Sequence, residues 1–167
     1  MQTLTKHSDL SRVRAVGPCR GGTEIAFANG RTACVPAGAP DARRLIDGAN
    51  AACASGEHVG LRLTDAGEVH DLSPARVSTV AFIRQDEARA DRLIVGFWAF
   101  GTLCYLMKDH PDFERLHRML QGAAGTETPV LFANHSCPVE DEEESWWRLL
   151  DARLVDSPAA NGAAKAS

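Results

Sequence analysis

The segment after residue 134 gathers side chains of the kind that bind metal ions. His135 and Cys137 stand two residues apart, and an acidic run that starts at Glu140 follows them. Imidazole, thiolate and carboxylate groups are ligands of zinc, and an open coordination position would make such a site catalytic. One hypothesis is therefore a metal-dependent enzyme with its site at His135 and Cys137. Against it, the segment holds one histidine and one cysteine, and the five cysteines of the chain form no CxxC pair.

Two adjacent tryptophans, Trp146 and Trp147, close the same segment. Successive side chains of a strand point to opposite faces, so both cannot enter one core. An exposed tryptophan beside the five acids of 140–144 would form an apolar anchor with a charged rim. Trp98 and Phe100, in an apolar stretch upstream, extend the same surface. The leading hypothesis is a non-enzymatic module that binds a protein partner, or a second copy of itself, through these residues. The alternative is a solvated acidic loop that covers a strand edge.

Sequence signatures of catalysis are absent. The chain has no GxSxG, HExxH or DxDxDG pattern, and no GxxxxGK[ST] or GxGxxG loop for phosphate. The cluster from Asp109 to Asp112 includes His110, but acids at a helix start are explained by capping and by the helix dipole. Cys19 lies in a Gly-rich stretch that reads as a hairpin turn, with Arg20 beside its thiol. These observations favour a protein that is not an enzyme and that carries no cofactor.

Bulk composition favours a globular protein of the cytoplasm. The chain has 167 residues, 44% hydrophobic and 24% charged, which is ordinary for a folded domain. The longest apolar run, Leu93 to Met107, is too short to span a membrane and contains two glycines. The first residues lack the apolar stretch of a signal peptide, and an odd number of cysteines argues against a disulfide framework. We therefore expect no membrane association.

An internal duplication with a period of about seventy residues organises the chain. Phe27, Thr32 and Cys34 recur at an offset of 70 as Phe97, Thr102 and Cys104, and Val13 and Val16 recur at 64 as Val77 and Val80. Further matches at offsets of 71 and 80 pair the following residues: Pro40 with Pro111, Asp41 with Asp112, Arg44 with Arg115, and Asp71 with Asp151. We place Cys34 and Cys104 at equivalent core positions, as small apolar side chains.

Each copy predicts three strands, a helix and two strands. The Asn29-Gly30 pair indicates a two-residue hairpin turn in the first copy. Each helix starts beside a proline, carries apolar residues at helical spacing, and stops at a glycine, Gly56 or Gly125. The predicted fold class is α+β, mostly β: a duplicated βββαββ unit, either two small OB-like barrels or a ββαββ sandwich with both helices on one side.

The domain boundaries follow from this duplication. We expect an N-terminal arm over residues 1–10, repeat 1 over 11–74, repeat 2 over 75–156 and a flexible tail over 157–167. Repeat 2 differs by an inserted acidic and tryptophan-containing loop over 134–148, and loops of this kind often carry function. We expect the repeats to pack about a pseudo-two-fold axis, because the second hairpin is apolar on both faces and needs cover.

A barrel of the OB type suggests a further alternative function, the binding of single-stranded nucleic acid. Such binding uses a basic groove with aromatic stacking platforms. Repeat 1 could supply the basic side with Arg12, Arg14, Arg20 and Arg31. The net charge of −4 and an aromatic content of only 6% make nucleic acid the less favoured partner.

Overall fold

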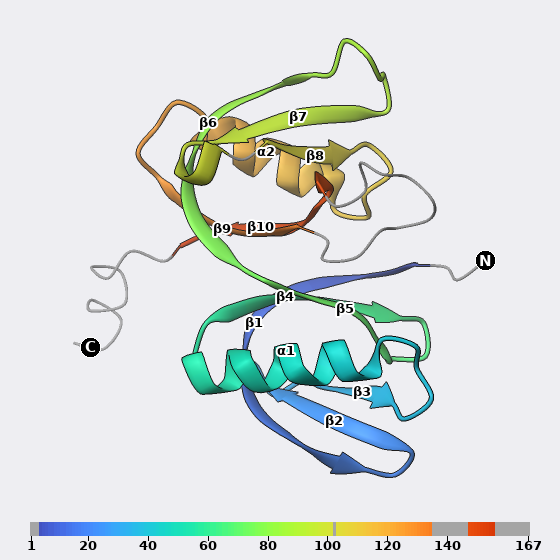
Figure 1. Cartoon of the computed structure of the whole chain (residues 1–167). Coiled ribbons are helices and arrows are strands. Elements are labelled where there is room, and N and C mark those ends of the chain that lie inside the picture. Colours follow the sequence, from blue (N-terminus) through green and yellow to red (C-terminus); the bar gives the residue numbers. More distant parts are fainter. Residues whose placement is uncertain (1–3, 102, 135–146, 156–167) are drawn as a thin grey trace.

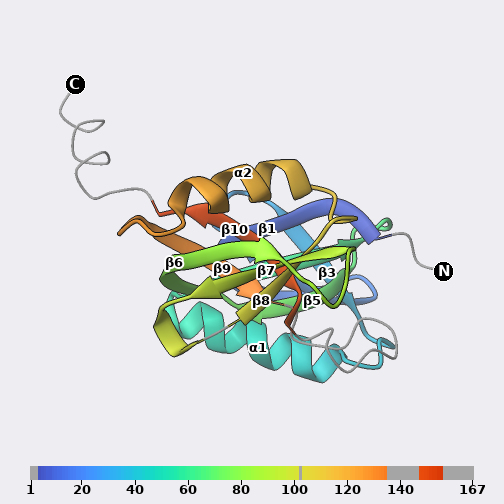
Figure 2. The same ribbon diagram turned by 90° about the horizontal axis from the view of Figure 1, so that it is seen from above.

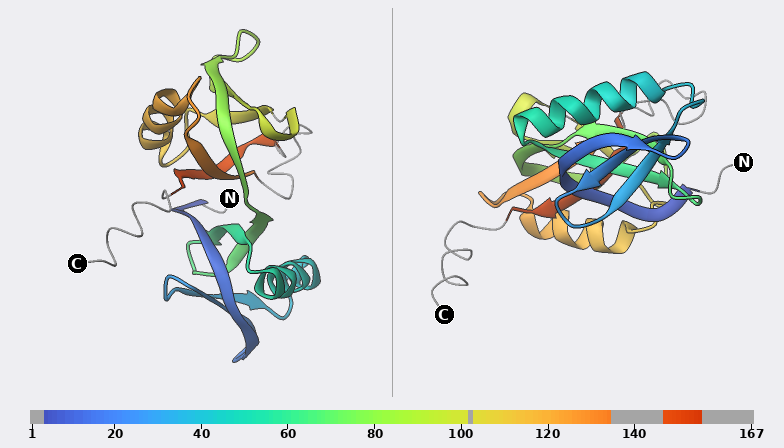
Figure 3. Two further views of the ribbon diagram at one scale, coloured as in Figure 1. Left: turned by 90° about the vertical axis from the view of Figure 1, so that its left-hand side faces the viewer. Right: turned by 90° about the horizontal axis from the view of Figure 1, so that it is seen from below.

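The computed structural model describes residues 4–101, 103–134 and 147–155, and side chains from Leu10 onward. It contains two similar units, here called repeat 1 (residues 4–74) and repeat 2 (76–155), one stacked on the other (Figure 1). Figure 3 shows the same stacking from the side. The mostly β, α+β duplication is confirmed, and the order in each unit is three strands, a helix and two strands.

Repeat 1 is a five-stranded antiparallel sheet in the order β3-β2-β1-β4-β5. Its elements are β1 (Leu4–Cys19), β2 (Gly22–Phe27), β3 (Thr32–Pro36), α1 (Ala42–Ser55), β4 (His58–Thr64) and β5 (Val69–Pro74). Strand β1 starts at Leu4, inside the range expected to form an arm, because its first residues pair with β4. Four residues separate β2 from β3, where Asn29-Gly30 predicted a two-residue turn.

Repeat 2 has the same topology, β8-β7-β6-β9-β10. Its elements are β6 (Arg76–Gln85), β7 (Arg92–Phe97), a short 3-10 helix η1 (Ala99–Gly101), β8 (Leu103–Met107), α2 (Phe113–Ala123), β9 (Pro129–Asn134) and β10 (Leu149–Leu154). Among the described residues, no helix is long and apolar enough to cross a membrane.

Each sheet curls until its two edge strands meet. One parallel bridge joins Cys34 of β3 to Glu68, directly before β5, and another joins Tyr105 of β8 to Arg148, directly before β10. This strand order and closure are those of an OB-type barrel with the helix between the third and fourth strands. The two helices lie on opposite flanks of the molecule and not on one side (Figure 2), so the sandwich alternative is wrong.

The helices contribute the predicted apolar stripes to two separate cores. Leu45, Ala49 and Ala52 of α1 pack into the core of repeat 1, and Leu116, Leu120 and Ala123 of α2 pack into the core of repeat 2. Helix α1 ends at Gly56, whose φ of 71° is the left-handed conformation that favours glycine. In the second core the rings of Phe97 and Phe132 stack 3.8 Å apart.

Strand pairing corrects two of the offsets taken from residue matches. Val13 pairs with Phe27 and Val80 pairs with Phe97, so the first strands correspond at an offset of 67 and not 64. Ile25 pairs with Ala33, whereas Val95 pairs with Cys104. The extra residue of repeat 2 therefore lies in the β7–β8 connection, before Cys104.

The consequence for the cysteines is a change of face. Cys104 corresponds to Ala33 and is buried, whereas Cys34 corresponds to Tyr105 and is half-buried on the outer face. A shift of one residue moves a strand side chain to the opposite face of its sheet. The expectation that Cys34 and Cys104 are equivalent core residues is therefore wrong.

The repeats meet about a pseudo-two-fold axis through their fourth and fifth strands, and β1 also packs against β10. Strand β4 packs against its counterpart β9, and the reciprocal pairs β5 with β9 and β10 with β4 are both present. Leu10, Leu131 and Ala133 form a small core between the repeats. Gly60 lies at the closest approach, where an added Cβ would be 2.6 Å from Cβ of Ala133. Strands β7 and β8 lie on the far side of repeat 2 (Figure 1), so the expected cause of the pairing, cover for the second hairpin, is wrong.

Candidate functional site

Large apolar side chains are exposed on the outer face of repeat 2, where β7, β8 and the start of β10 come together. Trp98 is 71% exposed, Trp147 50% and Leu103 45%. Leu103 pairs with Gly96, two residues before Trp98. The bridge between Tyr105 and Arg148 brings Trp147 beside β8. We call this region the aromatic surface; it consists of Phe82, Ile94, Trp98, Leu103 and Tyr105, and the exposed Trp147 lies at its edge beside β8.

Strand alternation fixes which side chains belong to this surface. Val95 and Phe97 of β7 enter the core, as do Cys104 and Leu106 of β8, so the residues between them face outward. Phe82 of β6 lies over Gly96, where an added Cβ would be 2.5 Å from the phenyl ring. Because Gly96 has no side chain, the Phe82 ring can lie directly on the sheet at this position.

Cationic groups hold two of these rings. The Arg92 guanidinium carbon lies 3.7 Å from the centre of the Tyr105 ring, and that of Arg84 lies 5.1 Å from the centre of the Phe82 ring. Both distances are within the range of cation–π attraction. Arg92 is itself buried and donates a hydrogen bond of 2.5 Å from Nε to Asp86, which lowers the pKa of Asp86. The buried ion pair of Arg92 and Asp86 thus anchors the Tyr105 ring on the sheet.

The other residues predicted for the protein-binding surface fall partly outside the described structure. Trp146 lies outside the described residues, and Phe100 is described only as backbone, in η1. The predicted residues Trp98 and Trp147 do lie on the same part of repeat 2. Leu103 and Tyr105 belong to the second hairpin, which the sequence already marked as apolar on both faces, whereas sequence reasoning missed Phe82.

The four arginines of the nucleic-acid hypothesis do not gather in one groove. Arg12 and Arg31 flank the β2–β3 end of repeat 1, where their carbonyls accept hydrogen bonds from Ala28 and Phe27. Arg14 is exposed at the bulge of β1, and Arg20 is exposed in the β1–β2 turn at the opposite end. At about 3.3 Å per residue, Arg12 and Arg20 are about 26 Å apart along the strand.

The residues of the metal hypothesis, His135 and Cys137, lie outside the described residues. Within the described part of the chain, no three or more histidine, cysteine or acidic side chains cluster to hold a metal ion. His110 has a structural role: its Nε2 lies 2.8 Å from the carbonyl oxygen of Leu150, and its Nδ1 accepts the amide hydrogen of Asp112. It therefore joins the start of α2 to β10.

Acidic residues at the two helix starts likewise serve the fold. Arg115 reaches from α2 to Asp112 and to the buried Asp151 of β10, the latter at 2.7 Å. The equivalent Arg44 of α1 lies 3.6 Å from Asp41 and 3.9 Å from Asp71. These residues supplied much of the repeat signal in the sequence, and the structure explains it as a clamp between helix and last strand in each copy.

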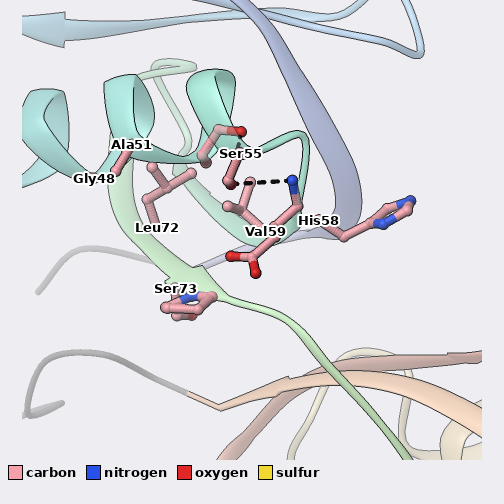
Figure 4. Close-up of a pocket in the computed structure, with 10 residues that line it drawn as sticks. Gly48, Ala51, Ser55, His58, Val59, Leu72 and Ser73 are labelled. Atoms are coloured by element: carbon pink, nitrogen blue, oxygen red, sulfur yellow. Dashed lines mark hydrogen bonds between the residues drawn. The ribbon is translucent and has the colours of Figure 1, made fainter.

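An open pocket of about 270 Å³ lies between the second half of α1 and the facing ends of β4 and β5 (Figure 4). Its walls are mostly small or apolar side chains. Ser55 is engaged in the local turn, since its Oγ accepts the amide hydrogen of Glu57. His58 extends away from the helix residues of the pocket (Figure 4), and burial together with Arg12 and Arg153 lowers its pKa. The pocket therefore presents no group of side chains poised for acid–base or nucleophilic chemistry.

Comparisons with known proteins identify no relatives of this chain. No family model, no curated protein and no solved structure matches this chain. Its candidate site consequently depends on geometry, and among the described residues the aromatic surface is the site that the geometry supports best.

Proposed function

We propose that this chain is a non-enzymatic binding module of the cytoplasm that holds a partner protein against the aromatic surface of repeat 2. The observation that carries this proposal is the exposure of Trp98 and Leu103 on the outer face of repeat 2, with the exposed Trp147 next to the bridge that joins Arg148 to β8. Monomeric soluble proteins rarely leave a cluster of large apolar side chains in water, and such patches mark interaction sites. Tryptophan is also enriched among the residues that dominate binding energy in interfaces.

Position on the barrel supports the same proposal. OB-type barrels bind ligands, among them oligonucleotides and oligosaccharides, on the face of the second and third strands, between the loop that joins the first two strands and the loop that joins the last two. In repeat 2 these strands are β7 and β8, and the second loop leads from β9 to Trp147. The aromatic surface therefore occupies the usual binding face of the architecture.

The acidic run of the sequence favours a protein with a basic rim over a nucleic acid. Five consecutive acids, 140–144, precede the tryptophans in the chain. Glu144 is three residues from Trp147, so their Cα atoms are within about 11 Å of each other whatever the loop conformation. Negative charge at this distance would repel phosphates and attract lysine or arginine side chains.

The test compares exposed tryptophans with an exposed apolar residue elsewhere. Partners captured on the full-length chain would be purified and titrated against the wild type, Trp98→Ala, Trp147→Ala and the matched control Leu154→Ala, which removes a side chain that is 47% exposed on β10. We expect each tryptophan variant to weaken binding about 30-fold, the effect of a 2 kcal/mol hot spot, with an unchanged melting temperature. The control should bind like the wild type.

Two alternative partners, a second copy of the chain and a single-stranded nucleic acid, would give different results in these experiments. Self-association would appear in sedimentation velocity as a concentration-dependent dimer that Trp98→Ala dissolves. A nucleic-acid binder would retain a mixed-sequence single-stranded oligonucleotide, with affinity that falls steeply as salt rises and that charge reversal at Arg12, Arg14 and Arg20 abolishes. Equal affinity of all tryptophan variants for the captured protein would refute the proposed surface.

A further inference from the structure

Two cysteines of repeat 1 meet across an intervening strand. Sγ of Cys19, at the end of β1, lies 3.5 Å from Sγ of Cys34 in β3, and both residues are half-buried, free thiols. Strand β2 runs between them, with Gly22 paired to Cys19 and Glu24 paired to Cys34. The thiols therefore contact each other over β2, on the outer face of the barrel.

Gly22 makes this contact possible. An added Cβ there would be 2.1 Å from the carbonyl oxygen of Val35, so β3 folds closely over β2 at this end of the sheet. No other residue fits this position without displacement of the β3 backbone. The close fold brings the outward side chain of Cys34 to the end of β1.

The equivalent three positions of repeat 2 hold a different cross-strand tie. With the corrected offsets, Cys19, Gly22 and Cys34 correspond to Asp86, Arg92 and Tyr105. These last three are the residues of the buried ion pair and its cation–π contact, described above. In both repeats, therefore, side-chain contacts at equivalent positions connect the end of the first strand to the third strand across the second. In repeat 1 the groups that meet are thiols, so the tie is one that redox chemistry makes or breaks.

The remaining described cysteines have other engagements. Cys53 contacts the carbonyl oxygen of Arg14 at 3.4 Å. Cys104 is buried, contacts Oδ1 of Asn134, and burial raises its pKa to about 12. Since the thiolate is the nucleophile, Cys104 is unreactive. The hydrogen bond with Cys19 raises the pKa of Cys34.

We propose that Cys19 and Cys34 are a redox modification site, converted to an intramolecular disulfide by a peroxide. The thiolate of one of the two cysteines attacks one peroxide oxygen, the O–O bond breaks, and one water leaves after protonation, so that this cysteine becomes a sulfenic acid. The sulfur of the other cysteine then attacks the sulfenic sulfur, the S–O bond breaks, and the hydroxide leaves with the proton of this second thiol as a second water. In sum, two thiols and one peroxide give one disulfide and two waters.

This site lies in repeat 1, apart from the aromatic surface, and stands independently of the proposed function. Its face is that of β2 and β3 together with the β1–β2 turn, the counterpart of the aromatic surface. A disulfide there would fasten β1 to β3 and fix the turn that carries Arg20. Because both thiols are accessible, a dithiol reductant would reverse the reaction.

The experiment treats the reduced full-length chain with hydrogen peroxide, blocks free thiols with an alkylating agent, and maps the product by mass spectrometry. Trypsin would release Cys19 in peptide 15–20 and Cys34 in peptide 32–43, so the expected product is this linked pair. The intact chain should lose two hydrogen atoms, regain them with dithiothreitol, and form no disulfide-linked dimer.

Matched variants separate this pair from the other thiols. Cys53→Ser and Cys137→Ser should form the same linked peptides at the wild-type rate, whereas Cys19→Ser and Cys34→Ser should form none. Circular dichroism would verify that all four variants keep the wild-type strand content. The proposal is refuted if the linked peptides contain another cysteine, if the disulfide joins two chains, or if peroxide yields only sulfinic acid at either residue.

Discussion

Packing between the repeats depends on the absence of a side chain at Gly60, and Gly60→Ala tests it. The new Cβ would lie 2.6 Å from Cβ of Ala133 and 2.8 Å from Cδ2 of Leu150. The leucine end can rotate, but the Ala133 methyl is fixed to β9, so the two sheets must separate by about 1 Å to restore a normal contact. Overpacking of this kind costs about 1–3 kcal/mol. A Gly→Ala change also removes entropy from the unfolded chain, worth about 0.4–1 kcal/mol in the opposite direction. The expected net loss of unfolding free energy is about 1–2 kcal/mol.

Urea denaturation of the full-length chain measures this loss. The control is Gly48→Ala in α1, where the added Cβ meets only Cδ2 of Leu72, at 3.8 Å. This contact is ordinary, so Gly48→Ala should stabilise the chain by about 0.5–1 kcal/mol, as expected inside a helix. The double variant Gly60→Ala with Ala133→Gly should recover part of the loss, because it moves the methyl group across the same contact. If Gly60→Ala is as stable as the wild type, the close packing of β4 on β9 is refuted.

Three further predictions concern charge and local packing. Burial lowers the pKa of His58 below its ordinary 6.5, so the unfolded chain binds the proton more readily, and unfolding free energy should fall as pH drops below 6.5. Titration of stability against pH should show a shallower fall for His58→Gln, and an unchanged slope would contradict this assignment. Arg115→Met leaves the buried carboxylate of Asp151 without its charged donor and should cost about 1–3 kcal/mol in urea denaturation; no loss would mean that solvent replaces the guanidinium. Gly96→Ala would collide with the Phe82 ring and should cost about 1–3 kcal/mol, with much less loss in the Phe82→Ala background; equal losses in both backgrounds would show that the ring is not the obstacle.

Element order and core stripes were predictable because they depend on local periodicity. Leu45 and Leu116 occupy helical spacings that remain visible in any alignment of the two copies, and Gly56 ends its helix for a backbone reason. The repeat offsets were less accurate, because single identities such as Cys34 with Cys104 cannot fix register. One inserted residue between β7 and β8 reverses the face of every later side chain in the strand.

The candidate site was predictable only in part. Tryptophans are candidate binding residues from their type alone, and Trp98 and Trp147 are exposed. The contact between Cys19 and Cys34 depends on how tightly β3 folds over β2, which is a property of sheet curvature and leaves no pattern in the sequence. The packing between the repeats was also not predictable, because it depends on the close approach at Gly60 and on a small apolar core whose residues, Leu10 and Leu131, lie far apart in the sequence.

The short junction between the repeats has a consequence for synthesis on the ribosome. Strand β5 ends at Pro74 and β6 begins at Arg76, so a single residue separates the two barrels. All strands of the first barrel have left the ribosome before β9 and β10 have been translated, and domains fold as units from the N-terminus. During that interval Leu10 and the strand around Gly60 lack their cover. The first barrel of a neighbouring nascent chain exposes the same uncovered face. Because β9 is made late, β9 of one chain could pack on the first barrel of another chain before it packs on its own.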